Sequence, residues 1–278
     1  MIDLKHLRRI LQTALEEDAG NGDLTTLATV KPGTRITGRF LCKGQGVLCG
    51  ADVVKETFAY LDAQITVSFH YQDGDAVRPG DVLAEIEGDA IPILTGERTA
   101  LNLLQHMSGV ATRTRAMAEL VKDYPVRLLD TRKTTPGLRM LEKYAVRVGG
   151  GHNHRFSLSD GILIKDNHIQ AAGGITAAVN AARQNAPFTL KIEVETETLD
   201  QVREALAAKA DIIMLDNMSV ERMKEAVALI NRRAVVEASG NMGQRDIREV
   251  AATGVDCISV GDLTNAVCPL DISLRLNL

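Results

Sequence analysis

The sequence of 278 residues contains no tryptophan, and aromatic residues make up only 3% of it. Surfaces that bind single-stranded nucleic acid stack bases on aromatic side chains, so this scarcity argues against such a surface. The formal net charge is −4 and no polybasic run is present, which argues against bulk DNA binding and against attachment to a membrane surface. No apolar stretch approaches the ~20 residues that a membrane helix needs.

Cysteine is also scarce, with four residues and no CxxC spacing among them. A zinc site or a disulfide framework is therefore disfavoured, and we expect reduced thiols in a cytoplasmic protein. Residues 1–18 carry charges throughout an amphipathic helical pattern, which is not that of a signal peptide. No GxGxxG motif follows a first strand, which disfavours a dinucleotide-binding fold.

Two regions with different patterns are present. Residues 35–94 read as short alternating strands separated by glycine and aspartate turns. Within them, residues 73–88 resemble the small β module of biotinyl and lipoyl carriers. A carrier needs an exposed lysine at a hairpin tip, and none is evident, so we expect a structural module. Apolar residues at helical spacing then predict a helix over 94–123, with a domain boundary inside or just before it.

From residue 126 onward, short apolar strands alternate with helices. Strands are predicted at 126–130, 161–165, 189–194, 211–215, 234–238 and 257–261, and helices at 175–185, 199–209, 220–231 and 244–254. Such alternation indicates right-handed βαβ crossovers and a parallel sheet covered on both faces. The pattern leaves open whether this sheet forms a closed barrel, an incomplete barrel or an open doubly wound sheet.

Polar residues or glycine follow each of these strands. They are Thr131, Arg132 and Lys133 after the first strand, Lys165, Asp166, Asn167 and His168 at the end of the second, Glu195 after the third, Asp216 and Asn217 after the fourth, Ser239, Gly240 and Asn241 after the fifth, and Gly261 and Asp262 at the end of the sixth. In a parallel barrel all these positions lie on the rim where barrel enzymes carry their active sites. The pattern therefore predicts an active site on one rim.

The charges at this rim predict an anionic ligand. Arg132, Lys133, Arg155 and Lys165, together with His154, form a cationic cluster in a chain that is acidic overall. Arginine binds carboxylate and phosphate through paired hydrogen bonds, and lysine adds a point charge. Two carboxylates at neighbouring strand ends (Glu195 and Asp216) would repel this ligand unless Mg²⁺ lay between them. The two glycine turns after the last strands are typical phosphate sites.

The stretch "VGGGHNHRFSLSDGILIKDNH" (148–168) raises an alternative, because His152 and His154 could together ligate a metal. A metal site of that kind needs further histidine and aspartate ligands at other strand ends. The other ends supply arginine, lysine and glycine instead, so anion recognition is the better interpretation. The simplest role for His152 and His168 is hydrogen bonding within the loop.

Long motifs in this sequence resemble those of the quinolinate phosphoribosyltransferase family. They are "EEDAGNGDLTT", "ERTALNLLQHMSGVAT", "LLDTRKTTPGLRMLEKYAVRVGGGHNHRFSLSDGILIKDNHI", "IEVET", "MLDN", "EASGN" and "SVGDLT", in order over nearly the whole chain. The resemblance implies an N-terminal open α/β sandwich (1–103), a C-terminal incomplete α/β barrel of the TIM type (104–265), and a last segment (266–278) that returns to the first domain.

The resemblance also implies a reaction. Quinolinate and phosphoribosyl pyrophosphate would give nicotinate mononucleotide, pyrophosphate and CO₂ in de novo NAD biosynthesis, with Mg²⁺ as cofactor. The functional unit would be a homodimer in which Arg98 reaches into the partner's site.

Roles for individual residues follow from the same resemblance. Arg98, Arg132 and Arg155 would hold the quinolinate carboxylates, with His154 and Lys133 beside them and Thr131 nearby. Lys165 would contact charged ligand groups, and Glu195 and Asp216 would bind the ribose hydroxyls and the metal. Ser239, Gly240 and Gly261 would hold the 5′-phosphate, and their neighbours Asn241, Val260 and Asp262 are further expected substrate-binding residues. Lys133, Lys165, Glu195 and Asp216 are the expected catalytic residues.

One motif departs from the family pattern. The family more often has "SVGALTHS" where this chain has "SVGDLTNA", so that Asp262 and Asn265 replace the usual residues. A carboxylate that pointed into the phosphate site would weaken binding of phosphoribosyl pyrophosphate. We expect Asp262 to face solvent or to cap a helix.

Three other functions compete with this interpretation. An aldolase-like barrel would use Lys165 to form a Schiff base, but the cationic surroundings of that lysine favour phosphate. A related transferase-like protein associated with molybdate transport shares the fold, and the intact HNHR and KDNH motifs argue against it. The third alternative is a lipoyl-like carrier or scaffold built on residues 73–88.

Overall fold

The computed structural model describes residues 2–277, which fold into two compact units. Unit 1 comprises residues up to 115, residues 135–150 and residues from 267 onward, and unit 2 comprises residues 116–134 and 151–266. The expected boundary between residues 103 and 104 falls inside one long helix, α4 (Ala90–Val121).

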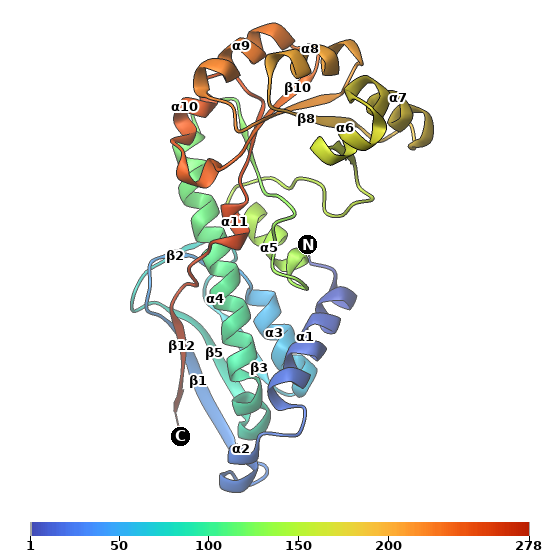
Figure 1. Cartoon of the computed structure of the whole chain (residues 1–278). Coiled ribbons are helices and arrows are strands. Elements are labelled where there is room, and N and C mark those ends of the chain that lie inside the picture. The colour runs from blue at the N-terminus through green and yellow to red at the C-terminus, as the bar shows by residue number, and fades with distance from the viewer. Residues whose placement is uncertain (1, 278) are drawn as a thin grey trace. The chain divides into compact units, whose positions relative to one another are not determined.

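Unit 1 is built on an antiparallel sheet with the strand order β12-β1-β5-β3 (Figure 1). Its strands are β1 (Arg35–Cys42), β3 (Thr66–Phe69), β5 (Val82–Asp89) and β12 (Ile272–Asn277), and a short pair is formed by β2 (Gly46–Val47) and β4 (Ala76–Val77). Its helices are α1 (Leu4–Ala19), α2 (Leu24–Thr29), α3 (Ala51–Leu61), the first part of α4, and α5 (Arg139–Val148). The last strand pairs with β1 along its whole length, so the end of the chain belongs to this unit.

Helix α3 corrects the prediction that residues 35–94 are strands throughout. Its residues Val53, Val54 and Phe58 are fully buried, at a spacing that suits one helical face. The carboxylate of Asp73 accepts hydrogen bonds from the backbone N–H groups of Gly50 and Ala51 and so satisfies the start of the helix. The pattern of residues 51–61 was helical, and the interpretation of this segment as strand was wrong.

Unit 2 is built on a parallel sheet with the strand order β6-β11-β10-β9-β8-β7. Its strands are β6 (Arg127–Leu129), β7 (Ile162–Ile164), β8 (Ile192–Thr196), β9 (Ile212–Asp216), β10 (Val235–Ser239) and β11 (Cys257–Ser259). The helices are α6 (Asp166–Ala172), α7 (Ile175–Asn185), α8 (Leu199–Ala207), α9 (Val220–Ile230), α10 (Ile247–Ala251) and α11 (Asp262–Asn265), with a 3₁₀ turn η1 (Met242–Gln244). This arrangement confirms the predicted alternation and parallel sheet, and adds the short helices α6 and α11, which the sequence analysis missed.

The barrel of unit 2 is incomplete because its two edge strands, β6 and β7, do not pair with each other in the sheet. The loop that carries His152 pairs with β6 instead: the backbone N–H of His152 donates to Leu128, and its carbonyl accepts from Asp130. The HNHR motif therefore lies beside the open edge of the sheet.

Capping side chains begin three of the helices that follow the strands. Thr198 forms a reciprocal capping box with Gln201 at α8, Ser219 caps α9, and Asp246 caps α10. Each of these side chains satisfies a backbone N–H that the first helical turn leaves without a partner. The strand ends that precede the helices are held in place in this way.

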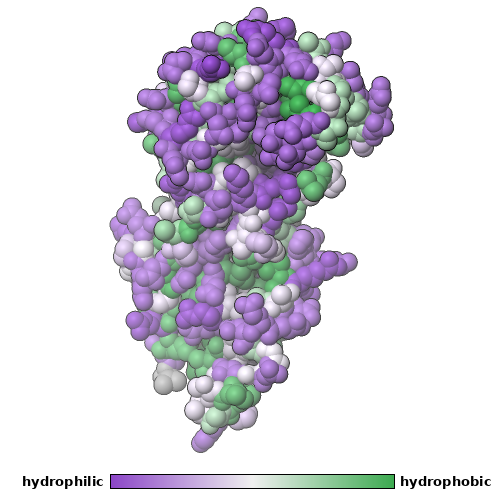
Figure 2. Space-filling model, viewed as in Figure 1, coloured by the Kyte–Doolittle hydropathy of each residue, from purple (hydrophilic) through white to green (hydrophobic). Residues whose placement is uncertain are grey.

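The face of the molecule in Figure 2 carries mainly hydrophilic residues, with hydrophobic ones in separate patches. Across residues 2–277, no helix combines the length and the apolar character that crossing a membrane requires.

Candidate active site

A cavity of about 450 Å³ lies at the carboxyl ends of the strands of unit 2. It is lined by Thr131, Arg132, Lys133, His154, Arg155, Leu163, Lys165, Glu195, Met214, Asp216, Asn217, Glu237, Ser239, Gly240, Asn241, Met242, Ser259, Gly261 and Asp262. Thirteen of the residues in this list were expected at the site from the sequence. The structure thus brings side chains from all six strand ends to one cavity.

Two expected residues do not line this cavity. Val260 is fully buried, and its backbone N–H donates to the carbonyl of Leu129. Arg98 lies on α4 in unit 1, where it is exposed. Its expected role in a partner's site stays a prediction.

Most of the cavity residues that the sequence analysis missed lie two positions before an expected one. Leu163 precedes Lys165, Met214 precedes Asp216, Glu237 precedes Ser239, and Ser259 precedes Gly261. Successive side chains of a strand point to opposite faces, so residues two apart share the barrel interior. Counting back by two from each expected strand end would have found all four residues.

His154 lies between two buried glutamates at the bottom of the cavity. Its Nε2 is 3.2 Å from Glu193 Oε2 and 3.5 Å from Glu237 Oε2. Burial lowers the pKa of His154, but the hydrogen bonds and charges of the two carboxylates outweigh it and raise that pKa to about 10. The backbone N–H of Arg155 acts in the opposite direction, because it donates to Nδ1 at 2.8 Å and so favours an unprotonated Nδ1. Two carboxylates outweigh one amide dipole, and the net shift is upward.

The same three residues could be taken for a metal site, since their ligand atoms lie within 4.8 Å of one another. A metal on Nε2 would require a proton on Nδ1, because a neutral imidazole carries one proton on one of its two nitrogens. The backbone N–H of Arg155 disfavours that proton, and the raised pKa of His154 means that Nε2, where a metal would bind, holds a proton of its own. The ring therefore fits a hydrogen-bonded role between the two glutamates better than a metal-ligand role.

The His-x-His alternative is not supported by the geometry. His152 contributes backbone hydrogen bonds to β6, and it is absent from the group of possible metal ligands among the described residues. His168 accepts a hydrogen bond at Nδ1 from the backbone N–H of Lys165, at 3.0 Å. For His168 the predicted structural hydrogen bond is confirmed.

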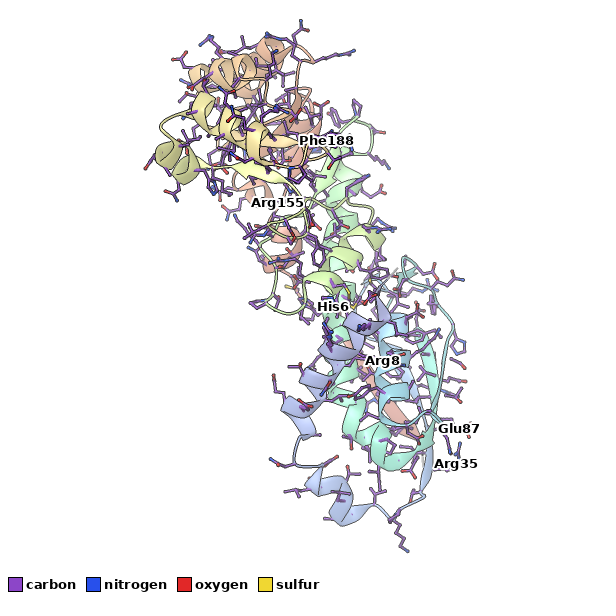
Figure 3. The ribbon with its side chains drawn as sticks, turned by 90° about the vertical axis from the view of Figure 1, so that its right-hand side faces the viewer. His6, Arg8, Arg35, Glu87, Arg155 and Phe188 are labelled. Carbon is purple, nitrogen blue, oxygen red and sulfur yellow. The ribbon has the colours of Figure 1, made fainter. Side chains whose placement is uncertain are left out.

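Two guanidinium groups share one side of the cavity. Arg155, on the loop before β7 (Figure 3), donates from Nη1 to the carbonyl of Gly161 at 2.9 Å. Burial and the charge of Arg132 lower the pKa of Arg155, which means that the two cations repel each other. An anion bound between them would relieve this repulsion.

The carboxylates at the ends of β8 and β9 face a lysine. Lys165 Nζ lies 3.3 Å from Glu195 Oε2. Burial raises the pKa of Glu195, the Lys165 ammonium lowers it, and the charge of Asp216 raises it again, so the net shift is upward. The carboxylates of Glu195 and Asp216 therefore repel each other, and a cation bound between them would reduce this repulsion.

Two glycine turns, after β10 and β11, form another part of the cavity wall. Gly240 has a φ of 96°, a left-handed conformation that favours glycine, and Gly261 lies against the side chain of Lys133. Thr264 Oγ1 donates to the carbonyl of Lys133 at 2.7 Å and holds this lysine over the second turn. The expected phosphate turns and one expected lysine are therefore adjacent.

Asp262 lines the cavity, which corrects the expectation that it faces solvent or caps a helix. No side chain caps α11, and Asp262 is the first residue of that helix. Its carboxylate packs closely against Gly243 in η1, where an added Cβ would lie 2.0 Å from Oδ2.

A second cavity, of about 390 Å³, lies at the amino ends of the same strands. It shares three lining residues with the first, namely His154, Arg155 and Glu237, and Glu193 also lines it. The buried group formed by His154 and the two glutamates thus lies between the two ends of the barrel interior.

Comparison with protein families gives matches over most of the chain. Residues 23–108 match the family model of the quinolinate phosphoribosyl transferase N-terminal domain, and residues 110–275 match that of its C-terminal domain.

Among individual proteins, a probable nicotinate-nucleotide pyrophosphorylase (carboxylating) of Bacillus subtilis is 45% identical over 272 residues, covering 98% of this chain and 94% of the relative. The mitochondrial quinolinate phosphoribosyltransferase (decarboxylating) 2 of Nicotiana glauca is 41% identical over 290 residues, covering 98% of this chain and 82% of the relative. The solved structure of the nicotinate-nucleotide pyrophosphorylase from Francisella tularensis has a TM-score of 0.94 at 40% identity, covering 100% of this chain and 98% of the other.

Proposed function

The chain belongs to the quinolinate phosphoribosyl transferase family, and we propose that its cavity transfers phosphoribose from phosphoribosyl pyrophosphate to quinolinate with loss of CO₂. The products are nicotinate mononucleotide, pyrophosphate and CO₂, a step of NAD biosynthesis. One observation carries this proposal: four arginine and lysine side chains and two glycine turns surround a single cavity that also holds the carboxylates of Glu195, Asp216, Glu237 and Asp262. A diacid and a phosphorylated sugar together match that distribution of charge.

Quinolinate binds on the side of Arg132 and Arg155. Its two carboxylates accept hydrogen bonds from the guanidinium groups, and their charge relieves the repulsion that lowers the pKa of Arg155. The contact of Arg155 with the carbonyl of Gly161 orients the guanidinium before the substrate arrives. The rigid planar groups align the pyridine ring for attack.

Phosphoribosyl pyrophosphate binds across the rest of the cavity. Its 5′-phosphate lies against the turns at Ser239–Gly240 and Gly261, with Lys133 beside them. Asp216 and Glu195 bind the ribose hydroxyls. The oxygen donors of Glu195 and Asp216 also suit Mg²⁺, which when bound neutralises charge on the pyrophosphate leaving group.

Loss of pyrophosphate leaves positive charge on the anomeric carbon of the ribose, and the carboxylates of Glu195 and Asp216 stabilise that charge. The lysines, Lys133 and Lys165, stabilise the negative charge that develops on the departing group. The quinolinate nitrogen forms the new bond to the anomeric carbon as the bond to pyrophosphate breaks. The pyridinium ring then accepts the electron pair of the C2–carboxylate bond when CO₂ leaves, and C2 takes up a proton.

The proposed functional unit is a homodimer in which Arg98 completes the partner's quinolinate site. Arg98 is exposed on α4, as a residue that reaches another subunit must be. In the described part of the chain all four cysteines are free thiols, which is compatible with the proposed cytoplasmic location.

Product analysis tests this function. The protein is incubated with quinolinate, phosphoribosyl pyrophosphate and Mg²⁺, and CO₂ and the mononucleotide are measured. We expect both products in equal amounts, and a much lower rate with nicotinate, which lacks one of the two carboxylates. Absence of the mononucleotide with an intact, folded protein would contradict the proposal.

A further inference from the structure

We infer that Asn217 is a positioning residue that holds the ribose-binding carboxylate of Asp216 at a fixed distance from the phosphate-binding turn at residues 239–241. This inference rests on the proposed function and assigns a role within the same cavity. Asn217 follows the last residue of β9 and lines the cavity; the sequence placed it on the rim but gave it no role of its own.

The side chain of Asn217 bridges two strand ends. Its Nδ2 donates to Asp216 Oδ2 at 2.7 Å, and its Oδ1 accepts a hydrogen bond from Asn241 Nδ2 at 3.3 Å. Only the amide nitrogen can donate to a carboxylate, so this contact fixes which way the amide group points. One amide therefore connects the carboxylate of β9 with the turn that follows β10.

The backbone of Asn217 ties the same two strand ends together. Its N–H donates to the carbonyl of Ser239 at 3.0 Å and extends the parallel ladder in which Ser239 pairs with Asp216. The φ of Asn217 is 53°, in the left-handed region that asparagine and glycine adopt more readily than other residues. The left-handed conformation places the side chain next to the neighbouring turn, where the hydrogen bonds are found.

The neighbouring turn is shaped to receive this side chain. A Cβ on Gly240 would lie 2.3 Å from Asn217 Oδ1 and 2.7 Å from its backbone nitrogen, so glycine is the residue that fits there. Gly240 and Asn241 also have positive φ values, 96° and 51°. Three left-handed residues on two adjacent loops thus pack against one another at the cavity wall.

The consequence for binding concerns the spacing of two ligand contacts. Asp216 is proposed to bind the ribose hydroxyls, and the turn is proposed to bind the 5′-phosphate of the same molecule. Asn217 engages Oδ2 of Asp216 and leaves the other carboxylate oxygen available to the ligand. Loss of the bridge leaves both contacts present but no longer held at the spacing that one ribose phosphate requires, which should weaken binding of phosphoribosyl pyrophosphate and spare quinolinate.

The test is a steady-state comparison of Asn217→Gly with the wild type. Glycine keeps the left-handed backbone and removes both side-chain hydrogen bonds. We expect the KM for phosphoribosyl pyrophosphate to rise by about tenfold, with the KM for quinolinate changed by less than about twofold. Because Asn217 is exposed, Tm should stay close to the wild-type value. Asn231→Gly is the matched control, since Asn231 is also exposed with a φ of 46° but ends α9 and is not among the cavity residues.

A second variant pair tests the bridge itself. If Asn217 and Asn241 act through one contact, the effect of Asn217→Gly combined with Asn241→Gly is smaller than the product of the two single effects. If the double variant instead raised the KM for phosphoribosyl pyrophosphate by the full product of the two single effects, the proposed bridge would be wrong. An unchanged KM for phosphoribosyl pyrophosphate in Asn217→Gly would also contradict it. A rise in both KM values together with a lower Tm would also overturn it, because that outcome indicates a general structural role. Failure of the wild type to form the mononucleotide would instead count against the proposed function.

Discussion

The sheets of the two units differ in where their charged side chains lie: in unit 1 they face solvent, and in unit 2 two of them point into the barrel interior. In unit 1, charged residues of β1 and β5 face solvent: Arg35 pairs with Glu87 at 3.0 Å (Figure 3), and Arg39 with Glu85 at 3.5 Å. All four side chains are more than half exposed. In unit 2, Glu193 and Glu237 point into the barrel, where they are 4% and 2% exposed. The same residue types are therefore screened by water in one sheet and buried in the other.

This difference separates structural charges from functional ones. Exposed ion pairs contribute about 0–1 kcal/mol, because water screens them and long side chains lose freedom on pairing. Buried carboxylates are unfavourable unless they have partners, so a barrel that contains them needs a compensating group such as His154. Charges inside the barrel of unit 2 therefore indicate a role in function, whereas charges on the sheet of unit 1 do not require one.

The largest expected effect comes from removing the partner of the two buried glutamates. His154→Ala leaves Glu193 and Glu237 facing each other without compensation, and should lower the free energy of unfolding by about 3–5 kcal/mol. Urea unfolding at neutral pH measures this change. Arg39→Ala is the control in the other sheet and should cost at most about 1 kcal/mol. If the two substitutions lowered the free energy of unfolding equally, the proposed difference between buried charges in unit 2 and exposed charges in unit 1 would be wrong.

Arg132→Ala should give the next largest effect, on catalysis. Loss of one charged contact to a quinolinate carboxylate is expected to cost about 2–5 kcal/mol of transition-state binding, measured as a fall in kcat/KM. Arg35→Ala, which removes an exposed arginine of unit 1, should leave kcat/KM unchanged. A change of less than about threefold in Arg132→Ala would contradict the proposed role of this arginine.

The buried His154 of unit 2 should also make the free energy of unfolding depend on pH. The pKa of His154 is raised from 6.5 to about 10, so the stabilisation from its protonated ring is fully present below about pH 6.5 and is lost as the pH rises toward 10. The slope from this one group is at most about 1.4 kcal/mol per pH unit. Unfolding curves between pH 6.5 and 10 for the wild type and His154→Asn measure it. Parallel curves for the two proteins would show that the ring does not titrate in this range.

The smallest expected signal tests whether unit 1 contributes to a partner's site. Arg98→Ala and Lys165→Ala should each be inactive alone, and mixing them should restore about one quarter of wild-type activity, because half of the dimers are mixed and each of these has one intact site. The activity is assayed after subunit exchange has been verified with differently tagged chains. Continued inactivity of the exchanged mixture would place Arg98 outside any shared site.

The strand–helix alternation of unit 2 could be predicted because each of its strands is a short apolar run, and helix α7 spans the predicted residues 175–185. In unit 1 the segment at residues 51–61 was misread, because a few buried apolar positions in a short segment fit more than one pattern. The rim residues were predictable because parallel strands end on one edge. Glu193 and Glu237 were not selected as partners of His154, because their distance in sequence does not reveal a contact across the barrel.

The sequence alone determined which chemical groups are present and, through their position after each strand, that they meet at one rim. It also determined the local conformations that depend on neighbouring residues, such as the capped helix starts and the left-handed glycine turns. Only the tertiary structure decided the pairings: His154 with two glutamates, Lys165 with Glu195, and Asn217 with Asp216 and the turn after β10. These contacts, apart from the one between Asn217 and Asp216, join residues from separate segments, so they depend on the register and curvature of the sheet, which arise from packing of the whole unit.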